Sequence, residues 1–260
     1  MDFWHRHFSA CSYLVMLCLV VSGALFSCAP GQVTEEHRAE LHLQIGTAML
    51  AKGNYPGALQ ELLVAEKMEP KNPVIQNNLA LAYFVRQKYR EAEGHLKAAL
   101  AESPNYTDAR NNLGRVYIET AQYDLAISVL QKANEDLTYA YPDKTLTNLG
   151  IAYFNKGEFS VALEYLKKSL AIRRENCLTF NYYGRCLFEL SEFQLAADSF
   201  DQAIELCKSS QFDEPNYFAA LSYYKLGDRP RAIARLEELV TRFPQGRYSD
   251  QSKSMLELIR

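Results

Sequence analysis

The sequence predicts an all-α solenoid of six stacked helical hairpins, from a repeat period and a matched set of small and large residues. Small residues recur along the 260 residues at intervals of 34 or 36 positions. Each is followed 12 positions later by Ala and 16 positions later by Leu or Phe, so a large side chain would fill the space where two helices approach closely. Such a period is typical of solenoids, whose units bury their apolar faces against one another. The small residues are Gly46, Ala80, Gly114, Gly150, Gly184 and Ala220.

The repeat resembles the tetratricopeptide repeat (TPR), whose units carry Leu-Gly, a Tyr three residues on, an Ala, an aromatic residue or Leu, and a closing Pro. The third unit shows this pattern in Leu113, Gly114 and Tyr117. Aromatic residues fill the hollows beside the small ones, which accounts for 17 Tyr against one Trp. The resemblance implies a right-handed superhelical solenoid of six TPR hairpins. The Trp usual at position 4 of a unit is absent, so we expect loose packing there.

The first element reads as a targeting segment. An apolar run of 14 residues, 13–26, is shorter than the ~20 residues that span a bilayer and fits the core of a signal peptide. The residues Leu25-Phe26-Ser27-Cys28 resemble a bacterial lipobox, which implies a lipid on Cys28 and cleavage before it. We therefore expect a lipoprotein signal peptide at 1–27 and a lipidated Cys with a tether at 28–38. A plain secretory signal and an uncleaved anchor are the alternatives.

A TPR domain at 39–260 should follow, with a first and a second helix in each repeat. The third unit is lengthened within 134–142 and a second irregularity lies near 211–212, and solenoids place such insertions in loops. Residues 247–259 follow Pro244 and Gly246 and predict a capping helix over the last repeat. The predicted repeats are 39–72, 73–106, 107–142, 143–176, 177–210 and 213–246.

The sequence offers little for catalysis or for metal binding. A net charge of −3 argues against nucleic-acid binding. His37 and His42 are five residues apart, which does not place two ligands on one helical face, and no CxxC motif is present. Because phosphate-cradling Gly loops and a GxSxG motif are also missing, we expect no enzymatic activity, no cofactor and no small-molecule substrate.

The cysteines leave one question open. Cys177 starts the first helix of the fifth unit and Cys207 ends its second helix, and these ends lie close together in a helical hairpin. A disulfide could therefore form in an oxidising compartment. Three free buried thiols, with Cys186, are the favoured interpretation at this point.

The concave wall, which the TPR resemblance assigns to the first helices, is the candidate binding surface. Apolar positions there predict a rail for the side chains of a peptide, and the Asn and Arg residues between them could bond its backbone. The alternative is that these residues pack on the neighbouring unit. Of the paired lysines of a carboxylate clamp only Lys144 is present, which disfavours a C-terminal tail as ligand. The predicted groove residues are Leu43, Leu50, Asn77, Leu81, Phe84, Val85, Asn111, Arg115, Ile118, Ile151, Phe154, Asn181, Arg185, Phe188, Tyr217, Leu221 and Tyr224.

A lipobox followed by six TPR units resembles the type IV pilus pilotins (the PilF/PilW/Tgl type), and the segment 136–142 of the lengthened third unit adds a local match. The resemblance implies a lipoprotein of the outer membrane that faces the periplasm, binds the pilus secretin and promotes its localisation and multimer assembly. Its partners would be a protein and, through the acyl chains, the membrane. The alternatives are a lipoprotein scaffold that recruits peptidoglycan hydrolases or proteases, and a cytoplasmic or inner-membrane TPR adaptor.

The lipid anchor can be tested directly. In cells fed labelled palmitate, the wild-type protein should carry the label and Cys28→Ala should not, because the thioether needs this sulfur. Processing should also stop in globomycin. Equal labelling of both proteins would refute the lipobox assignment.

Overall fold

The computed structural model describes residues 34–208 and 212–259, so the predicted signal peptide and Cys28 lie outside the described residues. In these two ranges the chain forms 13 helices and no strand. The helices are α2 (Glu35–Ala51), α3 (Tyr55–Met68), α4 (Pro73–Phe84), α5 (Tyr89–Glu102), α6 (Thr107–Glu119), α7 (Tyr123–Asn134), α8 (Pro142–Asn155), α9 (Phe159–Ile172), α10 (Cys177–Glu189), α11 (Phe193–Leu206), α12 (Glu214–Lys225), α13 (Arg229–Arg242) and α14 (Ser249–Ile259).

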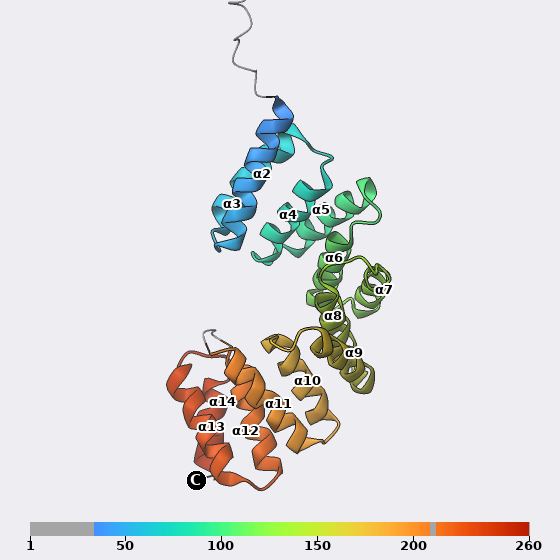
Figure 1. Ribbon diagram of the computed structural model, residues 1–260. Helices are drawn as coiled ribbons and strands as arrows, with labels where there is room; N and C mark the ends of the chain where they lie inside the picture. Colours follow the sequence, from blue (N-terminus) through green and yellow to red (C-terminus); the bar gives the residue numbers. More distant parts are fainter. Residues whose placement is uncertain (1–33, 209–211, 260) are drawn as a thin grey trace, which may run out of the picture.

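Six helical hairpins stack in chain order and α14 covers the last one, which confirms the predicted all-helical TPR solenoid. Each second helix packs against its own first helix and against the first helix of the next hairpin. The stack curves into an arc, with α2 and α3 at one end and α12–α14 at the other (Figure 1). The first helices α2, α4, α6, α8, α10 and α12 contact one another in turn and form one wall of this arc.

Local capping fixes where the helices begin. The Asn72 side chain accepts a hydrogen bond from the Val74 amide at 3.0 Å at the start of α4, and Thr34 accepts one from the His37 amide at 3.2 Å at the start of α2. Such caps satisfy amides that have no partner within the helix. The Thr34 cap starts α2 at Glu35, so residues 35–38, which we expected in the tether, are helical.

The close contact between the two helices of a hairpin depends on the recurring small residues. A Cβ atom added to Gly114 would lie 2.4 Å from Cγ of Leu130, and one added to Gly150 would lie 2.5 Å from Cγ of Leu166. Leu130 and Leu166 are fully buried. Glycine at these positions therefore lets the backbone of the first helix rest directly on the large residue of the second.

The interpretation that the fifth hairpin holds three free thiols is wrong, because two of its three cysteines are bridged. Cys177 and Cys207 form a disulfide with a Cα–Cα distance of 5.7 Å, which ties the start of α10 to the end of α11. Cys186 is free and buried, and burial raises the pKa of its thiol to about 12. The sequence favours free thiols at 177 and 207 because spacing alone does not show whether the two helix ends meet with their Cβ atoms facing each other.

Position 4 is packed more tightly than expected in the second hairpin, whereas His42, Arg110 and Phe180 at this position are only partly buried. In the second hairpin this position holds Gln76, which is 4% exposed. Its Nε2 donates hydrogen bonds to Glu66 at 2.9 Å and to the carbonyl of Pro70 at 2.8 Å, and its Oε1 contacts Nδ1 of His95 at 2.6 Å. A hydrogen-bonded amide thus takes the place that Trp fills in other TPR units.

Two glycine substitutions test this account of the hairpin contact. Gly114→Ala should lower the free energy of unfolding by about 1–3 kcal/mol, because the added methyl group overlaps Leu130. The matched control is Gly94→Ala in α5, where an added Cβ meets nothing within 4 Å, and it should raise the same quantity by about 0.5–1 kcal/mol. Urea unfolding followed by circular dichroism measures both. Equal shifts in the two variants would contradict the explanation.

Candidate functional site

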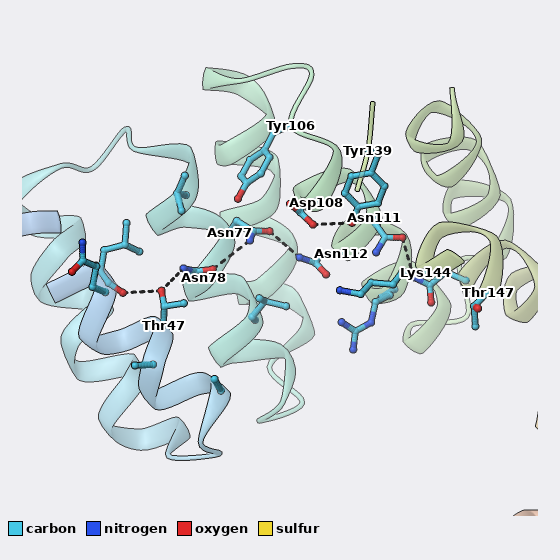
Figure 2. A pocket seen from close by; sticks show the side chains of 18 of the residues that line it. Thr47, Asn77, Asn78, Tyr106, Asp108, Asn111, Asn112, Tyr139, Lys144 and Thr147 are labelled. Carbon is cyan, nitrogen blue, oxygen red and sulfur yellow. Dashed lines mark hydrogen bonds between the residues drawn. The ribbon is translucent and has the colours of Figure 1, made fainter. Parts of the chain in front are cut away.

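A groove of about 950 Å³ lies on the wall formed by the first helices, from α2 to the start of α10. Helices α2, α4, α6 and α8 supply most of its lining, with the start of α10 at one end (Figure 2). The groove is therefore built by five successive hairpins, and its length follows their stacking direction. Among its lining residues are Leu43, Gln44, Thr47, Ala48, Val74, Asn77, Asn78, Leu81, Asp108, Asn111, Asn112, Arg115, Lys144, Thr147, Asn148 and Leu178.

The floor of the groove carries a row of amide side chains that hydrogen-bond from one helix to the next (Figure 2). Asn112 donates to Oδ1 of Asn77 at 2.9 Å, and Asn148 donates to Oδ1 of Asn111 at 3.0 Å. Asn77 and Asn111 are each 4% exposed. We expected Asn77 and Asn111 to bond a peptide backbone. In the structure the side-chain oxygen of each accepts a hydrogen bond from the next first helix instead.

The insertion in the third unit forms part of the groove wall. The Tyr139 hydroxyl donates a hydrogen bond to Oδ1 of Asp108 at 2.8 Å, and both residues line the groove (Figure 2). Burial, followed by this hydrogen bond, raises the pKa of Tyr139, so the hydroxyl remains a donor. The carboxylate of Asp136 accepts from the hydroxyls of Thr107 and Thr138, and these bonds hold its pKa below the ordinary value. The insertion is thereby fastened to α6.

Two cationic side chains line the same groove. The Arg115 guanidinium lies 4.6 Å from the centre of the Phe84 ring, and the Lys144 ammonium lies 4.0 Å from that of Tyr141. Burial lowers the pKa of Arg115, and Glu119 partly offsets this effect. Within the described part of the chain, neither cation forms an ion pair. The groove thus holds two cations against aromatic rings, with Glu119 acting on Arg115 from a greater distance than an ion pair.

The C-terminal half of the same wall is closed by contacts within the protein. Arg185 forms an ion pair with Glu214 at 2.9 Å, and Asn181 donates to the same carboxylate at 2.8 Å. Tyr217 stacks on Tyr248 with ring centres 4.7 Å apart. These predicted groove residues are therefore engaged by neighbouring repeats, as the alternative interpretation allowed.

Only some of the predicted groove residues line the observed groove. Leu43, Asn77, Leu81, Asn111 and Arg115 line the main groove. Phe84 lies with Leu81 and Arg115 around a small adjoining space between α4 and α6. The residues that lie outside the groove are Leu50, Val85, Ile118, Ile151, Phe154, Asn181, Arg185, Phe188, Tyr217, Leu221 and Tyr224.

Sequence reasoning missed most of the polar lining. Asn78 and Asn112 lie one position after the chosen Asn77 and Asn111, and together with Asn148 they recur at the repeat interval, which could have revealed the amide row. For Tyr106 and Tyr139 no repeat signal exists, because one closes a unit and the other lies in the insertion. The described residues contain neither a cluster of His, Cys, Asp or Glu suited to a metal nor a helix that could cross a bilayer.

Comparisons with known sequences support the repeat assignment. Tetratricopeptide repeat profiles match residues 83–138, 144–177 and 219–246. The type IV pilus assembly protein PilF of Pseudomonas aeruginosa is 24% identical over 62% of this chain and 64% of its own length. Superkiller protein 3 of Schizosaccharomyces pombe is 27% identical over 63% of this chain and 12% of its own length. The chain therefore matches less than two thirds of the length of these two relatives.

Solved structures show the same architecture. PilW, described as a widely conserved type IV pilus biogenesis factor, superposes with a TM-score of 0.74 at 21% identity, covering 82% of this chain and 97% of that one. PilF of Pseudomonas aeruginosa gives 0.72 at 20% identity, covering 85% and 99%. Cut9 in its complex with Hcn1 gives 0.77 at 18% identity, covering 93% and 45%. At these identities the likeness shows the fold alone.

The anchoring of the insertion can be tested with one hydroxyl group. Tyr139→Phe removes the donor to Asp108, and hydrogen bonds to charged groups contribute about 1.5–3 kcal/mol. Amide hydrogen exchange across residues 135–141 should become roughly tenfold faster or more. Tyr141→Phe is the matched control, since no hydrogen bond of its hydroxyl is found within the described residues, and it should exchange like the wild type. Unchanged exchange in Tyr139→Phe would show that this bond does not hold the insertion.

Proposed function

Because the chain is a TPR protein related to the type IV pilus biogenesis factors PilF and PilW, we propose that it is a non-enzymatic pilotin. It is held at the outer membrane by the lipid on Cys28, faces the periplasm, binds the pilus secretin through its groove and promotes the localisation and multimer assembly of that secretin. TPR proteins are protein-interaction scaffolds, which supports a protein partner. The lipobox and the lengthened third unit support the choice of partner.

The single observation that carries the proposal is that the groove begins at α2, the helix next to Cys28 in the chain. Only residues 29–34 separate Cys28 from the start of α2, which itself lines the groove. An extended chain spans at most about 3.6 Å per residue, so a lipid on Cys28 would keep the start of α2 within roughly 25 Å of the membrane surface. A segment held in the groove would therefore lie close to the bilayer that the secretin must enter.

The mechanism then follows from anchoring and capture. Each buried CH₂ group of an acyl chain contributes ~0.8 kcal/mol, so several chains give a stable anchor where one would be marginal. Capture in the groove shields a secretin segment from aggregation. It also raises the concentration of protomers at the membrane, where their assembly into a ring becomes effectively intramolecular. None of these steps needs covalent chemistry.

The groove can be blocked without touching the core. Ala48 is exposed on α2 and lines the groove, so Ala48→Trp places a large ring in the path of a bound segment. Ala98 is exposed on α5 and lies outside the groove, so Ala98→Trp is the matched control. We expect Ala48→Trp to lose about tenfold or more in secretin binding, and Ala98→Trp to bind as the wild type does.

Binding of the purified full-length proteins in detergent, and heat-stable secretin multimers in envelopes of cells that carry each variant, are the two measurements. Normal multimers in the Ala48→Trp strain would contradict the proposal. The same holds for normal multimers in a strain that lacks the gene.

A further inference from the structure

The solenoid contains the same cluster of side chains twice, 70 residues apart. In the N-terminal half Arg115 lies over Phe84, with the guanidinium carbon 4.6 Å from the ring centre. In the C-terminal half Arg185 lies over Phe154 at 4.5 Å. Asn111 precedes Arg115 by four residues, as Asn181 precedes Arg185. These three residues occupy equivalent positions, so the two halves can be compared directly.

The two copies differ in the residue contributed by the next first helix. In the C-terminal copy Glu214, 29 residues after Arg185, forms an ion pair with it and accepts a hydrogen bond from Asn181. At the equivalent position, 29 residues after Arg115, the N-terminal copy has Lys144. A pair of opposite charges in one half is therefore a pair of like charges in the other.

The two copies also differ in whether a side chain covers them. In the C-terminal copy Tyr248 covers the carboxylate, with its hydroxyl 3.2 Å from Glu214. The residue 70 positions earlier is Leu178, which is 43% exposed and lines the open groove. The N-terminal copy thus keeps the arginine, the amide and one of the three rings that lie against Arg185, and it has Asn112 and Asn148 where the closed cluster has Tyr182 and Phe218. It has no counterpart of the Glu214 carboxylate, because Lys144 stands there, and no counterpart of the Tyr248 ring, because Leu178 stands there.

We infer that the groove recognises an acidic side chain, Asp or Glu, within an extended segment of its partner, and holds that carboxylate between Arg115 and Lys144. The carboxylate takes the place that Glu214 fills in the C-terminal copy. Asn111 offers its amide group as Asn181 does, since Nδ2 of Asn111 makes no hydrogen bond within the described residues. This inference rests on the proposed function, because it assigns a ligand chemistry to the same groove.

Charge and shape favour an internal acidic residue over a chain end. Glu119 offsets only part of the cost of removing Arg115 from water, and a bound carboxylate would offset more of it with charge-assisted hydrogen bonds. Burial lowers the pKa of Arg115, which agrees with this reading. The groove runs from this cluster toward Thr47, and beside the cluster it stays open at the exposed Leu178. A bound segment can therefore continue beyond the acid in both directions.

The test uses the full-length lipoprotein in detergent and a positional-scanning library of short peptides with both ends capped. Binding is followed by fluorescence anisotropy. Peptides with a fixed Glu or Asp should bind about tenfold tighter or more than their Gln or Asn twins. Capping removes the terminal carboxylate, and an uncapped copy of each binding peptide measures what a free chain end adds.

One substitution should supply the missing carboxylate from within. Lys144→Glu places an acid where Glu214 stands in the other half, so it should pair with Arg115 and abolish the preference for acidic peptides. Arg115→Gln should abolish the same preference. The control Lys168→Glu makes the same change of charge at an exposed lysine, 5.3 Å from the Tyr165 ring and outside the groove, and should keep the preference. Circular dichroism of each variant checks that it folds.

Each outcome decides the inference separately from the proposed function. Equal affinity for acidic and amide twins overturns it, as does tight binding only with a free C-terminal carboxylate, and a library with no binding member does the same. Secretin binding that Ala48→Trp abolishes would leave the proposed function standing in all three cases. A clear acid preference without secretin binding would support the inference and reject the secretin as partner.

Discussion

The contact between a small residue on the first helix of each hairpin and a large residue on the second is the interaction on which the rest of the structure depends. At Gly114, Gly150 and Gly184 an added Cβ would meet the buried side chain opposite at less than 3.0 Å. The same contact recurs in six hairpins, so each presents its apolar faces to its neighbours in the same way. Repetition of one interface produces the arc and brings the first helices together along one wall.

That wall is used differently in its two halves. In the C-terminal half, Glu214 and Tyr248 complete a cluster around Arg185, so the charge of this arginine is paired within the protein. In the N-terminal half the corresponding acid is absent and a groove remains open. The insertion that breaks the repeat period adds Tyr139 to the groove wall and fixes it to Asp108. The open half is therefore polar at its floor, cationic near its middle and aromatic at its edge.

The disulfide between Cys177 and Cys207 bears on the compartment in which the protein works. Disulfides persist in oxidising compartments such as the bacterial periplasm and are rare where thiols are kept reduced. A bridge between the ends of one hairpin therefore agrees with export of the chain, which is also what the sequence-based prediction of a signal peptide at 1–27 implies. It also limits how far α10 and α11 can separate beside the closed half of the wall.

The sequence by itself determined the hairpins, because the residues that make each one, such as Gly114 and Leu130, lie 16 positions apart and repeat in register. It also indicated the disulfide as an option and marked the insertion. Only the tertiary structure decided which concave residues face the groove, because an apolar side chain such as Phe154 suits either a ligand or the next repeat. The pairing of Arg185 with Glu214 and the position of Arg115 in the groove depend on how one hairpin rotates against the next. That rotation is set by packing across neighbouring units, and no pattern within a single unit specifies it.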